Sequence, residues 1–171
     1  VALERRTAGI QLEDEAIEFR SESGLRGQLP KSAHVRVSSY NRMVLLSGEV
    51  SSENERSLAE RFVKSQDNVK LVVNDLAVSP ESSLTQRAKD KVITGQVRAI
   101  IIQARYIHSS AVQIVTERGI VYLMGRLTPA ESERVTDLVS TSQISGLQKV
   151  VKVFERISDT DLKRLVAPSR P

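Results

Sequence analysis

The chain carries one apolar pattern twice, and this internal repeat constrains the fold more than any other feature of the sequence. Six aliphatic or glycine positions recur with a constant offset of 77 residues: Val35, Val37, Val44, Leu46, Gly48 and Val50 return as Val112, Ile114, Val121, Leu123, Gly125 and Leu127. Flanking apolar positions return with offsets of 76 or 78 residues. A difference of one residue from the offset of 77 is what a loop that is one residue shorter or longer would produce. Two copies of one small domain are therefore expected.

Each copy predicts five elements in the order helix, strand, strand, helix, strand. In the second copy Ile93, Val97 and Ile101 follow helical spacing, and two alternating apolar strands then flank a short turn. Residues Thr128 to Glu131 form a capping box with proline at the first helical position, so the second helix starts there. The predicted segments are hairpins over 34–50 and 111–127, helices over 53–66 and 130–142, and final strands over 70–78 and 149–156. The predicted fold class is α+β: two tandem αββαβ domains, each a three-stranded mixed sheet packed against two helices.

Glycines mark the turns and strand ends of both copies, with one exception. The residues that we interpret as structural turn positions, rather than ligand-binding ones, are Arg42, Gly48, Gly119, Gly125 and Gly146. Arg42 stands where the second copy has Gly119, at a hairpin position that favours a left-handed backbone. Three alternatives follow: Arg42 is strained, Asn41 takes the left-handed position, or the turn is of another type.

Candidate catalytic and metal-binding groups are sparse. The chain has no cysteine, and its two histidines, His34 and His108, have no Asp or Glu at a shared spacing to form a relay. The acidic cluster Glu13, Asp14, Glu15 and Glu18 is interpreted as a helix start, where the helix dipole favours negative charge. No phosphate-binding loop, nucleophile elbow or zinc-protease motif occurs. We therefore expect no enzymatic activity, no metal and no cofactor.

The charge balance is only mildly basic. The chain has 25 Lys and Arg against 21 Asp and Glu, scattered among one another, with three Tyr and three Phe to stack on bases. No nucleic-acid partner is expected from this pattern. No apolar run is long enough for a membrane span.

Both copies resemble the BON-domain family. The resemblance lies in segments 43–48 and 119–125, which each end in Leu-x-Gly, and in the Asp67-Asn68-Val69 and Ser145-Gly146-Leu147 turns into the final strands. The implied organisation is an N-terminal segment over 1–11, a first BON domain over 12–78, a linker over 79–88, a second BON domain over 89–157, and a C-terminal tail over 158–171 without fixed structure.

The N-terminal segment resembles a more specific group. Residues 4–11, Glu-Arg-Arg-Thr-Ala-Gly-Ile-Gln, are similar to the Arg-Arg-Thr-x-Gly-x-Gln stretch that precedes the domains of dual BON-domain lipoproteins of the Gram-negative outer membrane. That resemblance implies a periplasmic location and an anchor on an acylated cysteine. Since the chain has no cysteine, we expect that the signal, lipobox and anchor were removed before Val1.

The first helices of the two copies differ in charge. Residues 13–30 carry a net charge of −3, and the matching residues 89–106 carry +3. On a helical projection of 89–106, a second apolar stripe lies opposite the core stripe, with basic residues beside it. The predicted lipid-binding residues are Lys91, Val92, Arg98, Ala99, Ile102, Arg105 and Tyr106. A basic, partly apolar outer face suits binding to anionic phospholipids at a membrane surface.

The family resemblance points the same way. It implies a non-enzymatic envelope protein that binds anionic phospholipid through the first helix of its second domain and supports outer-membrane integrity. The alternative is a protein-interaction module, in which that helix docks the first domain or an outer-membrane assembly or cell-division protein.

Overall fold

The computed structural model describes residues 4–166. The chain divides into two compact units. Of the described residues, 6–87 form the first unit, and 88–166 together with 4 and 5 form the second. No helix among the described residues has the length and apolarity needed to cross a bilayer.

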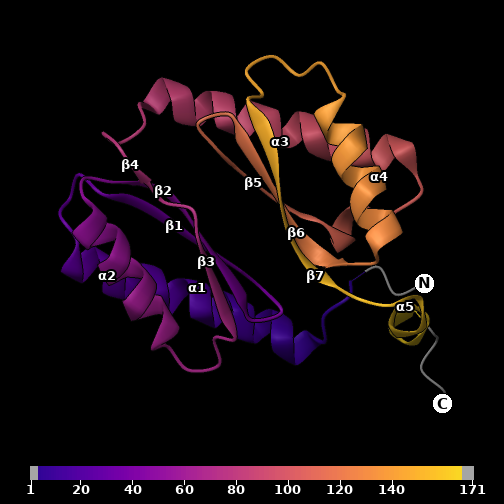
Figure 1. The fold of residues 1–171 in the computed structure, drawn as a ribbon, viewed down its shortest axis with the longest axis horizontal. Coiled ribbons are helices and arrows are strands. Elements are labelled where there is room, and N and C mark those ends of the chain that lie inside the picture. The colour runs from indigo at the N-terminus through magenta and orange to yellow at the C-terminus, as the bar shows by residue number, and fades with distance from the viewer. Residues whose placement is uncertain (1–3, 167–171) are drawn as a thin grey trace. The chain divides into compact units, whose positions relative to one another are not determined.

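The first unit contains one αββαβ repeat. Its elements are α1 (Ala8–Gln28), β1 (His34–Tyr40), β2 (Met43–Val50), α2 (Glu53–Lys64), β3 (Leu71–Asn74) and β4 (Ala77–Val78). Strand β2 is antiparallel to β1 and parallel to β3 and β4. Helices α1 and α2 lie on one face of this sheet (Figure 1). The predicted last strand is thus split in two around Asp75 and Leu76.

The second unit repeats this arrangement. Its elements are α3 (Leu84–Ala104), whose first four residues belong to the first unit, a 3₁₀ turn η1 (Ser109–Ala111), β5 (Gln113–Glu117), β6 (Ile120–Leu127), α4 (Pro129–Ser140), β7 (Lys149–Arg156) and α5 (Asp159–Val166). Strand β6 is antiparallel to β5 and parallel to β7, and α3 and α4 cover one face of the sheet (Figure 1). The predicted α+β class with tandem αββαβ domains is confirmed.

Three predicted boundaries differ from the structure. Helix α1 begins at Ala8, inside the expected N-terminal segment, because the side chain of Thr7 accepts a hydrogen bond from the N–H of Ile10 and caps the helix. Helix α3 begins at Leu84, inside the expected linker. The C-terminal tail, expected without fixed structure, forms α5 over Asp159–Val166, started by reciprocal hydrogen bonds between Ser158 and Asp161. Residues 167–171 lie outside the described part of the chain.

Both hairpins turn through two residues with left-handed backbones. Asn41 and Arg42 have φ values of 49° and 65°, and Arg118 and Gly119 have 51° and 75°. Positive φ at both central positions defines a type I′ turn, the type that matches the twist of the flanking strands. Of the three alternatives for Arg42, the structure therefore combines two: both Asn41 and Arg42 are left-handed, and Arg42 has the steric cost of that conformation.

Each turn is held by one buried aspartate from the preceding helix. Asp14 on α1 accepts hydrogen bonds from the N–H groups of Asn41 (2.7 Å) and Arg42 (2.8 Å). Asp90 on α3 accepts from Arg118 and Gly119, both at 2.9 Å. The two aspartates are 0% and 3% exposed. The acidic cluster was therefore misinterpreted as a helix start: its Asp14 lies in the second turn of α1 and is an internal ligand of the hairpin.

The strand-end glycines allow close approach of the backbone. Gly48 has a φ of 114°, and a Cβ atom there would collide with the carbonyl oxygen of His34. A Cβ atom on Gly125 would collide with the carbonyl oxygen of Ala111. Gly146 has a φ of 86°, and its counterpart Asn68 has 68°. These positions serve the backbone geometry of each repeat.

We expect Asp90→Asn to lower the free energy of unfolding by about 2 kcal/mol, because the amide group offers one acceptor where two buried N–H groups need partners. Urea denaturation followed by circular dichroism measures the change. Glu133→Gln, on the exposed surface of α4, is the matched control. An Asp90→Asn midpoint equal to that of the control would contradict the role assigned to this carboxylate.

Arg42→Gly is expected to raise the free energy of unfolding by about 1 kcal/mol, because glycine adopts a left-handed backbone without the Cβ penalty. Gly119→Ala in the other hairpin should lower it, since the added Cβ would meet the carbonyl oxygen of Gly146. Thermal denaturation of the two variants beside the wild type tests both signs. A destabilised Arg42→Gly protein would show that the arginine side chain outweighs its backbone strain.

Candidate functional site

The outer face of α3 carries five of the seven predicted lipid-binding residues. Lys91, Val92, Arg98, Ala99 and Ile102 are all exposed on this helix. The side chains of Val92 and Ile102 are 59% and 54% exposed. The opposite face of the helix supplies Ile93, Val97 and Ile101 to the core of the second unit. The predicted division into a core stripe and an outer stripe is present in the structure.

The last two predicted residues lie beyond the helix. Helix α3 ends at Ala104, and Arg105 adopts a left-handed backbone with a φ of 60°. This conformation commonly terminates helices, so the helical projection no longer applies to Arg105 and Tyr106. The hydroxyl of Tyr106 donates a hydrogen bond to the carbonyl oxygen of Arg134 on α4 (2.8 Å). The Arg134 guanidinium lies 5.1 Å from the centre of the Tyr106 ring.

Tyr106 is therefore fixed on α4 rather than extended along the stripe. It is 37% exposed, and Arg105 beside it is exposed to solvent. Arg134 adds a further exposed cation next to this end of α3. The sequence analysis missed Arg134, since its contact with Tyr106 joins residues far apart in the chain.

The corresponding helix of the first unit uses its acids internally. Three carboxylates spaced four residues apart on α1, which we call the carboxylate ladder, accept hydrogen bonds from alternate N–H groups along β1 and its turn. Glu22 accepts from Val37 (3.0 Å), Glu18 from Ser39, and Asp14 from Asn41 (2.7 Å). Strand β1 is the edge of its sheet, so the ladder satisfies N–H groups that no neighbouring strand can pair.

The second unit retains only the first carboxylate of this ladder, as Asp90. Thr94 and Arg98 occupy the positions of Glu18 and Glu22, with the same offset of 76 residues that relates Asp14 to Asp90. The Thr94 hydroxyl lies 2.7 Å from that of Thr116 on β5, and Arg98 is exposed. Part of the charge contrast between the two helices thus has a structural origin: acids that bind a strand edge in one unit are replaced by a hydroxyl and a solvent-exposed cation in the other.

Ionisation of Glu18 is affected by its place in the ladder. Burial raises its pKa and the hydrogen bond from the N–H of Ser39 lowers it, while the neighbouring carboxylates of Glu22 and Asp14 add to the increase; the resulting pKa is about 7. A carboxyl with this pKa is partly protonated at neutral pH.

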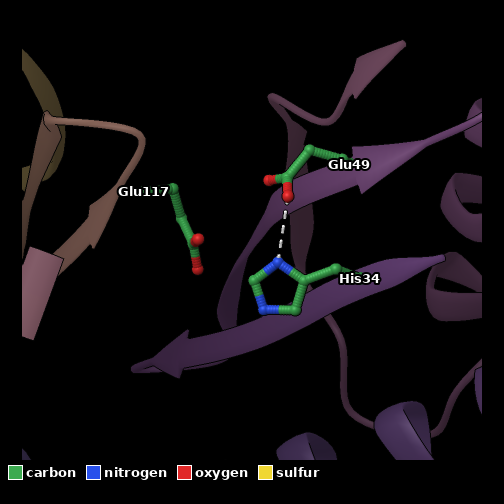
Figure 2. Close-up of side chains that lie close together, drawn as sticks. All are labelled: His34, Glu49 and Glu117. Carbon is green, nitrogen blue, oxygen red and sulfur yellow. Dashed lines mark hydrogen bonds and ion pairs between the residues drawn. The ribbon is translucent and has the colours of Figure 1, made fainter. Parts of the chain in front are cut away.

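One histidine of the pair has a carboxylate partner. His34 on β1 and Glu49 on β2 point toward each other, with 3.3 Å between Nδ1 and Oε1 (Figure 2). Burial would raise the pKa of Glu49, but hydrogen bonds from His34 and from the N–H of Ser82 outweigh it and lower the pKa to about 2. His108 instead contacts Ser110 in its own loop. The two histidines therefore occupy different environments and do not form a repeated site.

The N-terminal arginine motif serves both units. Arg5 is 8% exposed and makes a bidentate pair with Glu131 of α4, at 2.8 and 2.7 Å. Arg6 pairs with Asp14 (3.0 Å) and lies over the ring of Tyr40, 4.3 Å from its centre. Gln11 donates to the carbonyl oxygen of Arg6. The motif that resembles the lipoprotein relatives is therefore a structural one, and Arg5 belongs to the second unit while Arg6 belongs to the first.

A family model and a relative of similar sequence match this chain over both units. The family model described as BON domain matches residues 13–80 and 89–156. The chain is 34% identical over 157 residues to the "Outer membrane lipoprotein DolP" of Haemophilus influenzae, covering 91% of this chain and 80% of that protein. It is 27% identical over 154 residues to the "21 kDa hemolysin" of Actinobacillus pleuropneumoniae, covering 89% and 78%. A solved structure of CdsD, from the type III secretion system of Chlamydia trachomatis, aligns with 13% identity and a TM-score of 0.34, over 89% of this chain and 99% of that one.

The chain belongs to the BON-domain family, with one domain in each structural unit. The similarity to the Haemophilus lipoprotein extends over both domains. It is a dual BON-domain protein of the DolP type.

Glu18→Gln is expected to stabilise the protein at pH 8 but not at pH 4. The folded-state pKa of about 7 exceeds the ordinary value of 4.5, so the folded protein binds the extra proton between these values. Stability from this group is therefore lost as the pH rises through 7, and glutamine removes that loss while keeping the acceptor for Ser39. Urea midpoints at pH 4, 6 and 8 provide the measurement, with Glu15→Gln on the exposed side of α1 as control. A pH-independent difference would refute the assignment.

Proposed function

We propose that this protein is a non-enzymatic component of the periplasmic side of the outer membrane, where it binds anionic phospholipid through α3 and supports membrane integrity. The observation that carries the proposal is the outer face of α3, where exposed aliphatic side chains lie beside exposed cations. The envelope location is supported by the similarity to a protein named as an outer membrane lipoprotein.

The outer face has the chemistry that an anionic bilayer surface requires. Val92 and Ile102 are large enough to enter the boundary between headgroups and acyl chains when the helix lies along the surface. Lys91 and Arg98 on the helix, and Arg105 just beyond its end, are exposed and can contact phosphate groups. Each cation near an anionic surface contributes about 1 kcal/mol, so three would contribute about 3 kcal/mol.

That contribution has two consequences for binding. Electrostatic attraction of this kind is screened by salt, so binding through α3 should weaken as ionic strength rises. Two aliphatic side chains without a bulky aromatic wedge insert only shallowly, so α3 alone should give weak, reversible attachment. The outer face of α3 therefore supplements a second means of membrane attachment and does not replace it.

Arg98→Glu/Arg105→Glu is expected to reduce binding to vesicles containing phosphatidylglycerol at least tenfold at low salt, because two attractive charges become repulsive. Co-sedimentation with vesicles of rising phosphatidylglycerol content, at low and physiological salt, measures the loss. Lys163→Glu/Arg164→Glu, exposed on α5 of the same unit, changes the net charge equally and should bind like the wild type.

Two outcomes would count against the proposal. If both double variants lose binding equally, the protein responds to net charge and α3 is not a specific membrane face. If the wild type binds no vesicle at any salt concentration, the outer face of α3 is assigned to a protein partner instead.

A further inference from the structure

The first unit contains an open cleft between the end of α1 and the start of β1. Its volume is about 480 Å³, within the range of about 300–1,000 Å³ that is typical of small-molecule sites. Leu25 and Val35 form part of its wall, together with Leu29 and Ala33 of the connecting loop. Leu25 is 2% exposed, so the cleft reaches the core of the unit.

The second unit has a core side chain at the matching place. Helices α1 and α3 end at equivalent residues, Gln28 and Ala104, but the loop that follows α3 is longer. This longer loop contributes Ile107, which is 6% exposed and packs in one cluster with Ile101 and Val112. Those two residues are the counterparts of Leu25 and Val35, which line the cleft in the first unit.

The loop of the first unit supplies no equivalent side chain. Pro30, Lys31 and Ser32 are all exposed, and Leu29 and Ala33 only partly cover the core. Because the two units share one fold and Ile107 belongs to the same core cluster as the counterparts of Leu25 and Val35, the comparison indicates that an aliphatic group suits this space. In the second unit the group is part of the chain, and in the first unit the space is open.

The mouth of the cleft has a basic character. Arg26 and Lys31 line it and are exposed. The other two polar residues of the lining already have partners within the unit: Glu22 accepts a hydrogen bond from Val37, and His34 contacts Glu49. Arg26 donates one hydrogen bond to the hydroxyl of Ser23 (3.3 Å), which leaves other N–H groups of its guanidinium, together with the ammonium of Lys31, for a ligand that enters the cleft.

We propose that this cleft binds a single-chain lipid with an acidic headgroup, of the fatty-acid type. The acyl chain lies against Leu25, Leu29 and Val35, in the space that Ile107 fills in the other unit, and the headgroup lies between Arg26 and Lys31. This site is on the first unit and is independent of the membrane-binding face proposed for α3.

The test measures displacement of dansyl-undecanoic acid from the full chain by octanoate, decanoate and laurate, each below its micelle concentration. Binding should tighten by up to about fourfold for each added methylene until the cleft is full, as expected for burial of an alkyl chain. Ala33→Leu, which introduces an aliphatic side chain into the cleft, should weaken laurate binding at least tenfold. Dodecanol, which lacks the charge, should bind more weakly than laurate.

Charge variants keep the proposal testable if Ala33→Leu impairs folding. Arg26→Glu/Lys31→Glu changes two exposed residues and should weaken laurate at least tenfold while leaving dodecanol unchanged. Arg98→Glu/Arg105→Glu, the variant that tests α3, should bind laurate like the wild type. Absence of probe binding, or laurate affinity unaffected by both Ala33→Leu and Arg26→Glu/Lys31→Glu, would overturn the proposal without bearing on vesicle binding by α3.

Discussion

The architecture of each repeat depends on one buried carboxylate that joins a helix to a hairpin turn. A type I′ turn directs two adjacent N–H groups away from the hairpin, and both need acceptors when they are buried. Asp14 and Asp90 each supply two oxygens for this purpose from the second turn of a helix. Because Ile17 and Ile93 follow three residues later on the same helices, fixing the aspartate also directs these isoleucines into the cores. Turn, helix placement and core are therefore coupled through a single side chain.

The first unit extends this interaction along the strand, and helix geometry explains why the extension works. Four residues of a helix rise about 6.0 Å, and two residues of a strand rise about 6.8 Å. Carboxylates at every fourth position of α1 can therefore meet every second N–H of β1, as Asp14, Glu18 and Glu22 do. Such a ladder protects an edge strand from pairing with another chain. Its cost is the crowding of three acids beside a low-dielectric core, which is seen in the raised pKa of Glu18.

The sequence predicted what depends on local or periodic signals, namely the repeat, the order of elements, the α4 capping box and the two stripes of α3. It failed where a contact joins distant residues. The burial of Asp14 follows from a hairpin 27 residues away, although the recurrence of Asp14 as Asp90 with the helix offset was a signal that could have revealed it. The stripe was extended through Arg105 and Tyr106 because periodicity does not reveal a left-handed helix end. Both α5 and the Arg5–Glu131 pair rest on side-chain contacts that composition does not show.

The two repeats show where one fold can change its chemistry without losing its architecture. The elements that both units need in the same form are the hairpin, its aspartate and the glycine that ends the second strand, and all three are retained. The positions that differ between the units are those that these shared elements do not need. They are the second and third positions of the carboxylate ladder and the loop after the first helix of each unit. Replacing Glu22 by its counterpart Arg98 converts a strand-capping residue into a surface cation, and lengthening the loop by one residue inserts Ile107 into the core. Duplication thus lets one copy present a cationic helix while the other keeps an open cleft, because neither change disturbs the carboxylate that holds the hairpin.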